Sequence, residues 1–181
     1  MQNNGSQGQQ IGAWPHRALF VVALIACAAC SRATDNRAPE VPHDIRVPEG
    51  NKVHFHGYAQ GFQVYTWNGT DWGKAVPDAT LFDADGNVVA KHFAGPTWQS
   101  NSGSKVVGTV VPPKVTVNTN SIEWLLLIAA SAEGPGIFAD TTYVHRVNTV
   151  GGLPPSAPGL VVGQVAPIPY TADYFFYRKS K

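Results

Sequence analysis

The residues with the most chemical potential lie between positions 92 and 104, where a histidine, a tryptophan and several short polar side chains follow one another. Gly and Pro at 95 and 96 predict a sharp turn within this stretch. An aromatic surface beside neutral hydrogen-bonding groups is typical of sites for small polar molecules or glycans. The sequence therefore predicts a ligand-binding site made by His92, Gly95, Trp98, Gln99, Asn101 and Ser104. The alternative is a structural turn with Trp98 buried in the core.

A second group of residues has the spacing of metal ligands. His54 and His56 are two positions apart in an alternating segment, so we expect both imidazoles on one face of a strand. With His92 or His145 as a third ligand from a neighbouring strand, they would bind Zn²⁺ or Cu²⁺. The competing interpretation is a pair of solvated histidines with no cofactor, and it is favoured because no second close pair of ligands is present.

The signals for catalysis are weaker than those for binding. The serines at 100, 102 and 104 follow His92, but no Gly-x-Ser-x-Gly turn is present to expose a nucleophile. Nothing in the sequence brings two carboxylates together for glycoside hydrolysis. Asp83 and Asp85 begin like a calcium loop, yet Ala94 stands where a bidentate Glu is required, so a plain turn is expected. We predict no catalytic residues and a binding function.

The pattern of apolar residues predicts an all-β domain. Short blocks rich in Val, Ile, Thr and aromatic residues are separated by Gly, Pro, Asn and Asp, and no long segment has a helical period. About eight short antiparallel strands indicate a single β-sandwich or β-barrel. The expected strands cover residues 52–58, 62–67, 70–72, 80–82, 87–93, 105–111, 122–130, 141–147 and 173–177.

Three of these segments carry specific expectations. Pro112 and Pro113 are expected to stop the strand 105–111. The Leu-rich segment 122–130 is predicted as a central strand, with a helix as the alternative. A long Pro- and Gly-rich loop, 148–171, precedes the last strand, and it is either a lid or, as we favour, a cover for a sheet edge.

The N-terminus predicts export. An apolar run from Ala18 to Ala29 follows Arg17 and is too short to span a bilayer, as expected of a signal peptide. Leu24 to Cys27 has the form of a lipobox, which would make Cys27 a lipidated N-terminus, and ordinary secretory cleavage is the alternative. We expect a signal peptide at 1–26, a Pro-rich tether at 27–50 and one domain at 51–181, in the periplasm or cell envelope or secreted.

The charge balance limits the classes of partner. The chain has thirteen basic and twelve acidic residues, which gives a net charge of +1, and its sequence contains no basic stripe. Nucleic acid is therefore excluded as a partner, and a membrane is expected only through the lipid anchor. A small molecule or a glycan remains as the predicted ligand, and the sequence gives no oligomeric state.

Four ordered motifs resemble one family of exported proteins. They cover residues 59–65, 92–108, 142–152 and 169–177, and together they are similar to the DUF3455 domain over about 47–178. The resemblance implies no established activity, although some members carry a malate dehydrogenase label. Hydride transfer needs a nicotinamide bound at a Gly-x-Gly-x-x-Gly turn before a helix, and this sequence has none, so we reject that activity.

Overall fold

Eight antiparallel strands make up nearly all the regular structure of the protein. The structure is a computed structural model that describes residues 36–181, which belong to one compact unit. The predicted signal peptide and Cys27 lie outside the described residues. The elements are η1 (His43–Ile45), β1 (Asn51–Thr66), β2 (Val76–Phe82), β3 (Val88–Phe93), β4 (Thr97–Ser100), β5 (Lys105–Val115), β6 (Trp124–Glu133), β7 (Tyr143–Gly151) and β8 (Val165–Lys179).

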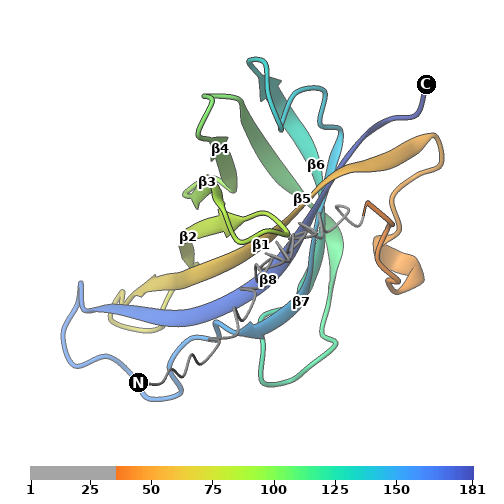
Figure 1. Cartoon of the computed structure of the whole chain (residues 1–181). Helices are drawn as coiled ribbons and strands as arrows, with labels where there is room; N and C mark the ends of the chain where they lie inside the picture. Colours follow the sequence, from red (N-terminus) through yellow and green to blue (C-terminus); the bar gives the residue numbers. More distant parts are fainter. Residues whose placement is uncertain (1–35) are drawn as a thin grey trace, which may run out of the picture. The chain divides into compact units, whose positions relative to one another are not determined.

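The strands close into an up-and-down barrel. Each strand pairs with the next along the chain, and β8 pairs with β1 over the whole length of both, as Figure 1 shows for these two long ribbons. This confirms the all-β prediction and, of the two architectures expected, selects the barrel. Closure leaves β8 paired on both sides, with β1 and with β7, so the predicted role of the Pro- and Gly-rich loop as an edge cover is wrong.

Several strands are longer than the sequence indicated. β1 joins two expected strands through Gly57 and Gly61, and at Gly61 an added Cβ would lie 2.2 Å from the backbone oxygen of Asp78. Only glycine therefore permits this close approach of β1 to β2. β5 continues through Pro112 and Pro113, which interrupt the pairing with β6 without ending the strand.

Two other boundaries differ from the prediction. Residues 70–72 lie in the loop before β2 and form no strand. The Pro- and Gly-rich connection is shortened to 152–164, because β7 runs to Gly151 and β8 begins at Val165. The Leu-rich segment 122–130, which was predicted as a strand with a helix as the alternative, contributes most of the strand β6. Among residues 36–181, no helix is long and apolar enough to cross a membrane.

A bulge at His54 breaks the alternation expected for residues 52–58. Val53 pairs with Tyr177 and Phe55 with Phe176, so His54 is the extra residue. Val53 consequently belongs to the cluster on the outer face of the barrel, whereas Phe55 belongs to the interior core. The simple alternation predicted for this strand fails because the bulge shifts the register by one residue.

One end of the barrel interior is filled by a packed core. The Phe176 ring lies 4.7 Å from the Phe138 ring and 5.7 Å from each of the Phe55 and Trp98 rings. Phe176, Phe138 and Trp98 are fully buried. Phe138 comes from the β6–β7 connection, so this loop closes the end of the barrel at which it lies. We call this region the packed end.

The segment before β1 covers the outer face of β7 and β8. Ile45 is fully buried, and its carbonyl oxygen lies 2.6 Å from Nε2 of His145, which therefore donates. The Tyr177 hydroxyl then donates to Nδ1 of His145 at 3.0 Å. Residues 36–50 are thus part of the domain, whereas the sequence assigned them to a tether. Apolar contacts from Val41 and Val47 to the outer cluster explain the difference.

Candidate functional site

The other end of the barrel interior is hollow. Its cavity has a volume of about 580 Å³, within the range of small-molecule sites. In an up-and-down barrel, the loops that follow the odd-numbered strands all lie at one end, and each of them contributes here. The contributions are Gly73 from the β1–β2 loop, Gly95 from the β3–β4 loop, Glu123 from the β5–β6 loop and Leu153 from the β7–β8 loop. We call this region the open end.

Two tryptophans of the β1–β2 loop hold together the loops around the mouth, which is the opening of the cavity at the open end. The Trp72 indole N–H donates to the carbonyl oxygen of Ala157 at 2.9 Å, which ties this loop to the β7–β8 loop. Trp67 packs edge to face on Trp72 at 5.5 Å. Gly159 lies so close to the Trp67 ring that an added Cβ would stand 2.4 Å from it. The β7–β8 loop is therefore fixed at the rim, and its light blue trace projects beyond β1 and β8 in Figure 1.

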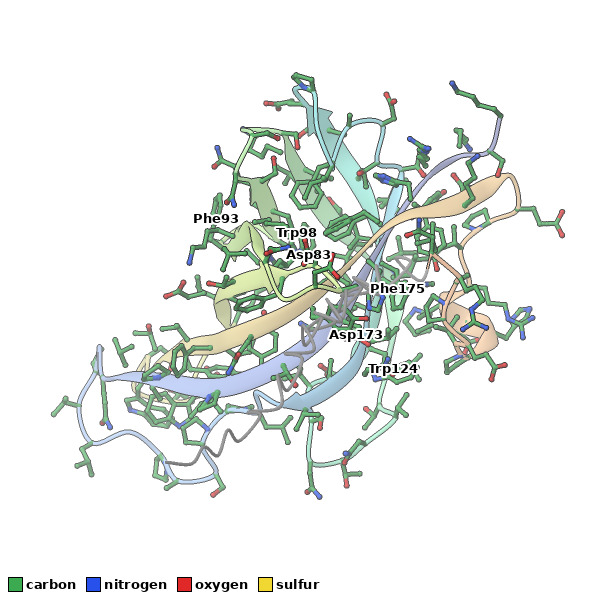
Figure 2. The ribbon with its side chains drawn as sticks, in the orientation of Figure 1. Asp83, Phe93, Trp98, Trp124, Asp173 and Phe175 are labelled. Carbon is green, nitrogen blue, oxygen red and sulfur yellow. The ribbon has the colours of Figure 1, made fainter. Side chains whose placement is uncertain are left out.

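Trp98 forms the boundary between the open and packed ends. Its ring stacks on His92 at 4.4 Å with an interplanar angle of 5°, and Tyr174 meets it edge on at 5.2 Å. Figure 2 shows Trp98 within the ring of strands, whereas Phe93 lies at the periphery. Gly108 of β5 makes room for this ring, since an added Cβ would lie 3.2 Å from it.

The wall of the cavity is mostly apolar. The alternation of each strand directs one face inward, and in β6 this face carries Leu125 and Leu127. Val110 of β5 and Ile122 of the β5–β6 loop line the same side of the cavity. Such a wall favours a ligand with apolar surface, because burying that surface releases about 25 cal/mol per Å².

Several buried polar atoms at the open end make no well-formed hydrogen bond with residues 36–181. They are the indole nitrogen of Trp98, the amide nitrogen of Gln63 and the hydroxyl of Tyr174, all on residues that line the cavity. The Tyr170 hydroxyl lies close to Tyr174 and Gln63, but it too makes no well-formed hydrogen bond. Unpaired buried polar groups cost about 1–3 kcal/mol each, so a cluster of them beside a cavity indicates where a polar ligand group binds.

Arg146 brings a positive charge to this cluster. It projects inward from β7, and its Nε and Nη2 donate to the backbone oxygen of Glu123 at 3.2 and 2.9 Å. Its charge acts on the protonation of Tyr65, His92, Tyr170 and Tyr174, so it lies within reach of all four. Among residues 36–181 no carboxylate forms an ion pair with Arg146.

Burial sets the protonation of the ionisable groups in the cavity. Desolvation raises the pKa of Tyr174 and of Tyr170, so both hydroxyls remain protonated donors. Desolvation lowers the pKa of His92 to about 3, which the nearby Arg146 charge reinforces. The neutral His92 donates from Nδ1 to the carbonyl oxygen of Thr97 at 2.9 Å. A base with so low a pKa is poorly suited to proton transfer near neutral pH.

The structure brings together only part of the predicted ligand site. His92, Gly95 and Trp98 line the cavity. Gln99 is exposed on β4, and the Asn101 side chain donates to the carbonyl oxygen of Val88 at 2.6 Å. Ser104 is fully buried near the packed end, where its hydroxyl bonds to that of Ser100 and accepts from the backbone N–H of Phe138. Asn101 and Ser104 lie in the loop that follows the even-numbered strand β4, away from the mouth.

The three histidines predicted as metal ligands do not converge. His92 lies inside the barrel, whereas His56 stacks at 3.9 Å on Phe175, which belongs to the outer cluster. Nε2 of the bulged His54 lies 3.3 Å from Oγ1 of Thr141. No three His, Cys, Asp or Glu side chains of the described part of the chain are placed to hold one metal ion. The Zn²⁺ or Cu²⁺ site expected from these residues is therefore not formed by this arrangement.

Several residues of the open end belong to none of the site motifs predicted from the sequence. These are Gln63, Tyr65, Glu123, Arg146, Tyr170 and Tyr174. One signal was available, since Arg146 shares its strand face with the buried Val144, and a cation on a buried strand face requires an explanation. The backbone oxygen of Glu123 gave no such signal, because its role depends on the pairing of β6 with β7.

A wider groove on the outer surface lacks these features. It has a volume of about 850 Å³ and is lined by residues of β1, β8 and the β2–β3 turn. Two of its polar side chains are paired with each other, since Asn148 of β7 donates to Asp173 of β8 at 2.7 Å. The Asp83 carboxylate accepts from the backbone N–H groups of Asp85 and Asn87, as the plain turn expected there requires. The open end of the barrel is thus the better candidate site.

Comparison with known proteins identifies one family and no individual relative. A family model described as "Protein of unknown function (DUF3455)" matches residues 48–178. The match spans every strand of the barrel, and the resemblance seen in the sequence motifs is confirmed. No curated protein and no solved structure shows significant similarity to the chain.

Proposed function

The chain belongs to the DUF3455 family, and we propose that it is a binding protein that takes a small, partly apolar molecule into the open end of its barrel. The observation that carries this proposal is the coincidence of a cavity of about 580 Å³ with unpaired buried groups of Gln63, Trp98 and Tyr174. A site built for a ligand leaves such groups without partners until the ligand binds.

Binding is favoured over catalysis by the state of the polar groups. His92 is held neutral, stacks on Trp98 and already donates to Thr97, so its arrangement suits a ligand-contacting wall. The serine hydroxyls at 100, 102 and 104 bond to one another near the packed end. The mixture of aromatic and aliphatic wall with a few polar groups is typical of a binding pocket.

The proposal is tested with the neutral, solvatochromic dye Nile red. We expect the wild-type protein to bind it with a blue shift of its emission, and Val110→Trp to weaken binding at least tenfold by filling the cavity. Thr109→Trp is the matched control, because Thr109 is the neighbouring residue of β5 and is exposed. Melting temperatures check that both variants fold. No binding to the wild-type protein, or equal binding to all three proteins, would refute the proposal.

We also propose that the protein is exported and anchored by a lipid on Cys27. The support comes from the sequence, namely the apolar run after Arg17 and the lipobox from Leu24 to Cys27. In cell fractionation, the wild-type protein is expected in the membrane fraction and Cys27→Ser in the soluble or secreted fraction. Cys30→Ser is the matched control. A wild-type protein found free of membranes, with an unmodified N-terminus by mass spectrometry, would contradict the lipid anchor.

A further inference from the structure

We infer that the ligand of the open end is an apolar carboxylate whose oxygens bind Arg146, an inference that rests on the proposed function. Three independent features of the cavity support it. They are the geometry of the Arg146 guanidinium, the excess of hydrogen-bond donors around it, and the distribution of charge between the interior and the mouth.

The guanidinium of Arg146 has one edge fixed by the backbone and no anionic partner among residues 36–181. Nε and Nη2 both donate to the backbone oxygen of Glu123, which orients the plane of the group. The guanidinium also interacts with the hydroxyl of Tyr174, but no carboxylate of residues 36–181 pairs with it. A guanidinium presents two parallel N–H groups on an edge, and these match the two oxygens of a carboxylate. A half-buried cation without an anion is costly, so a carboxylate ligand would supply the missing charge.

The groups near Arg146 are mainly donors. The Trp98 indole can only donate, and burial keeps the Tyr174 hydroxyl protonated, so it too has a hydrogen to donate. The Gln63 amide nitrogen adds further donor hydrogens. Gln63 and Tyr174 lie close to Tyr170, yet none of the three atoms makes a well-formed hydrogen bond with residues 36–181, so a ligand that brings acceptor oxygens would satisfy several of them at once. A hydroxyl group accepts but also donates, so a ligand with many hydroxyl groups, such as a glycan, would bring additional donors that need acceptors.

The charges of the lining residues also favour an anion. Lys74 and Lys114 are exposed at the mouth, and Arg146 lies deeper. Glu123 is the one acidic residue among the described residues that line the cavity, and it holds Arg146 through its backbone oxygen. Cations at the entrance raise the local concentration of an anionic ligand and guide it inward. The apolar wall of Val110, Leu125 and Leu127 then accommodates the rest of the ligand.

The inference is tested with two probes of nearly equal size, 2-naphthylacetate and 2-naphthylacetamide, by isothermal titration calorimetry at pH 7.5. We expect the wild-type protein to bind the carboxylate about 10–100-fold more tightly than the amide, as a charge-assisted hydrogen-bonded pair implies. Arg146→Gln is expected to remove this preference, and Arg146→Lys to keep only part of it, because an ammonium cannot bond Glu123 and a carboxylate in the same way.

Arg178→Gln is the matched control, since it removes an exposed arginine of β8 outside the cavity, and it should keep the full preference. Melting temperatures show whether each variant folds, and the wild-type comparison of the two probes needs no variant. Equal affinity for both probes, or binding of Nile red without binding of either naphthyl compound, would overturn the carboxylate inference while cavity binding stands. Absence of binding by all three compounds would refute the proposed function itself.

Discussion

The two ends of the barrel interior are built from the same strands, yet one is packed and the other hollow. In β8 the inward side chains change from Phe176 at the packed end to Tyr174 and Tyr170 toward the open end. In β7 they change from Val144 to Arg146. A few hydroxyl and guanidinium groups therefore replace purely apolar contacts over a distance of two to six residues.

This difference shows how a single sheet serves both stability and binding. The packed end gains from close ring contacts around Phe176, which stabilise the closed barrel. The open end keeps unpaired donors and an empty volume, both of which reduce stability until a ligand fills them. The predictions below test whether the two ends differ energetically as their structures indicate.

The largest effect is expected at the centre of the packed end. Phe176→Ala removes a fully buried ring that contacts three other rings, so we expect the free energy of unfolding to fall by about 3–5 kcal/mol. Urea denaturation followed by circular dichroism measures this change. Phe62→Ala is the matched control, because Phe62 is 43% exposed on β1. If both substitutions cost the same, the packed end is not the main source of stability.

The next effect concerns pH and the boundary between the two ends. Burial holds the pKa of His92 in the folded protein at about 3, below the value of about 6.5 in the unfolded chain. The unfolded chain therefore binds a proton that the folded protein does not, so this contribution to stability is complete above pH 6.5 and decreases as pH falls toward 3.

At pH 5 the loss attributable to His92 is about 2 kcal/mol. We expect His92→Gln to show a smaller decrease in unfolding free energy between pH 7.5 and pH 5 than the wild-type protein. Burial also lowers the pKa of His145, which remains in both proteins and serves as the internal reference. An identical pH dependence of the two proteins would mean that water reaches His92 and that the boundary at Trp98 is open.

A pair of identical substitutions compares the two ends directly. Leu81 is fully buried in the core, and Leu125 lines the cavity. Leu81→Ala creates a new void and is expected to cost about 3–4 kcal/mol, whereas Leu125→Ala only enlarges an existing cavity and is expected to cost about 2 kcal/mol. Thermal and urea unfolding of both variants gives the difference. Equal costs would show that the open end is as tightly packed as the other.

The smallest effects on the free energy of unfolding are expected from the hydroxyls of Tyr174 and Tyr177. They should have opposite signs, because only the Tyr177 hydroxyl has a well-formed hydrogen bond. Tyr174→Phe removes a buried hydroxyl without a well-formed hydrogen bond, so we expect a gain in unfolding free energy of up to about 1 kcal/mol. Tyr177→Phe removes a hydroxyl that donates to His145, and we expect a loss of about 1 kcal/mol. Differential scanning calorimetry measures both shifts. A loss in each case would indicate that the Tyr174 hydroxyl is already satisfied.

The local sequence pattern was sufficient to predict the fold class and the part of the site formed by His92 and Trp98. Alternation of apolar residues indicates strands at short range, and the His92–Trp98 turn follows from Gly95 and Pro96 at adjacent positions. Both parts of that motif pair within the β3–β4 hairpin, so their contact needs no distant strand. The same local logic failed at His54, where an extra residue in β1 changes which side chains face inward.

The sequence by itself determined an all-β chain that resembles the DUF3455 family, and the family match confirms it. Closure of the barrel, the hollow end and the position of Arg146 were decided only by the tertiary structure. The physical reason is that periodicity assigns side chains to two faces but does not say which face is enclosed. That depends on the pairing of β1 with β8, and on β6 and β7 bringing the Glu123 backbone to Arg146.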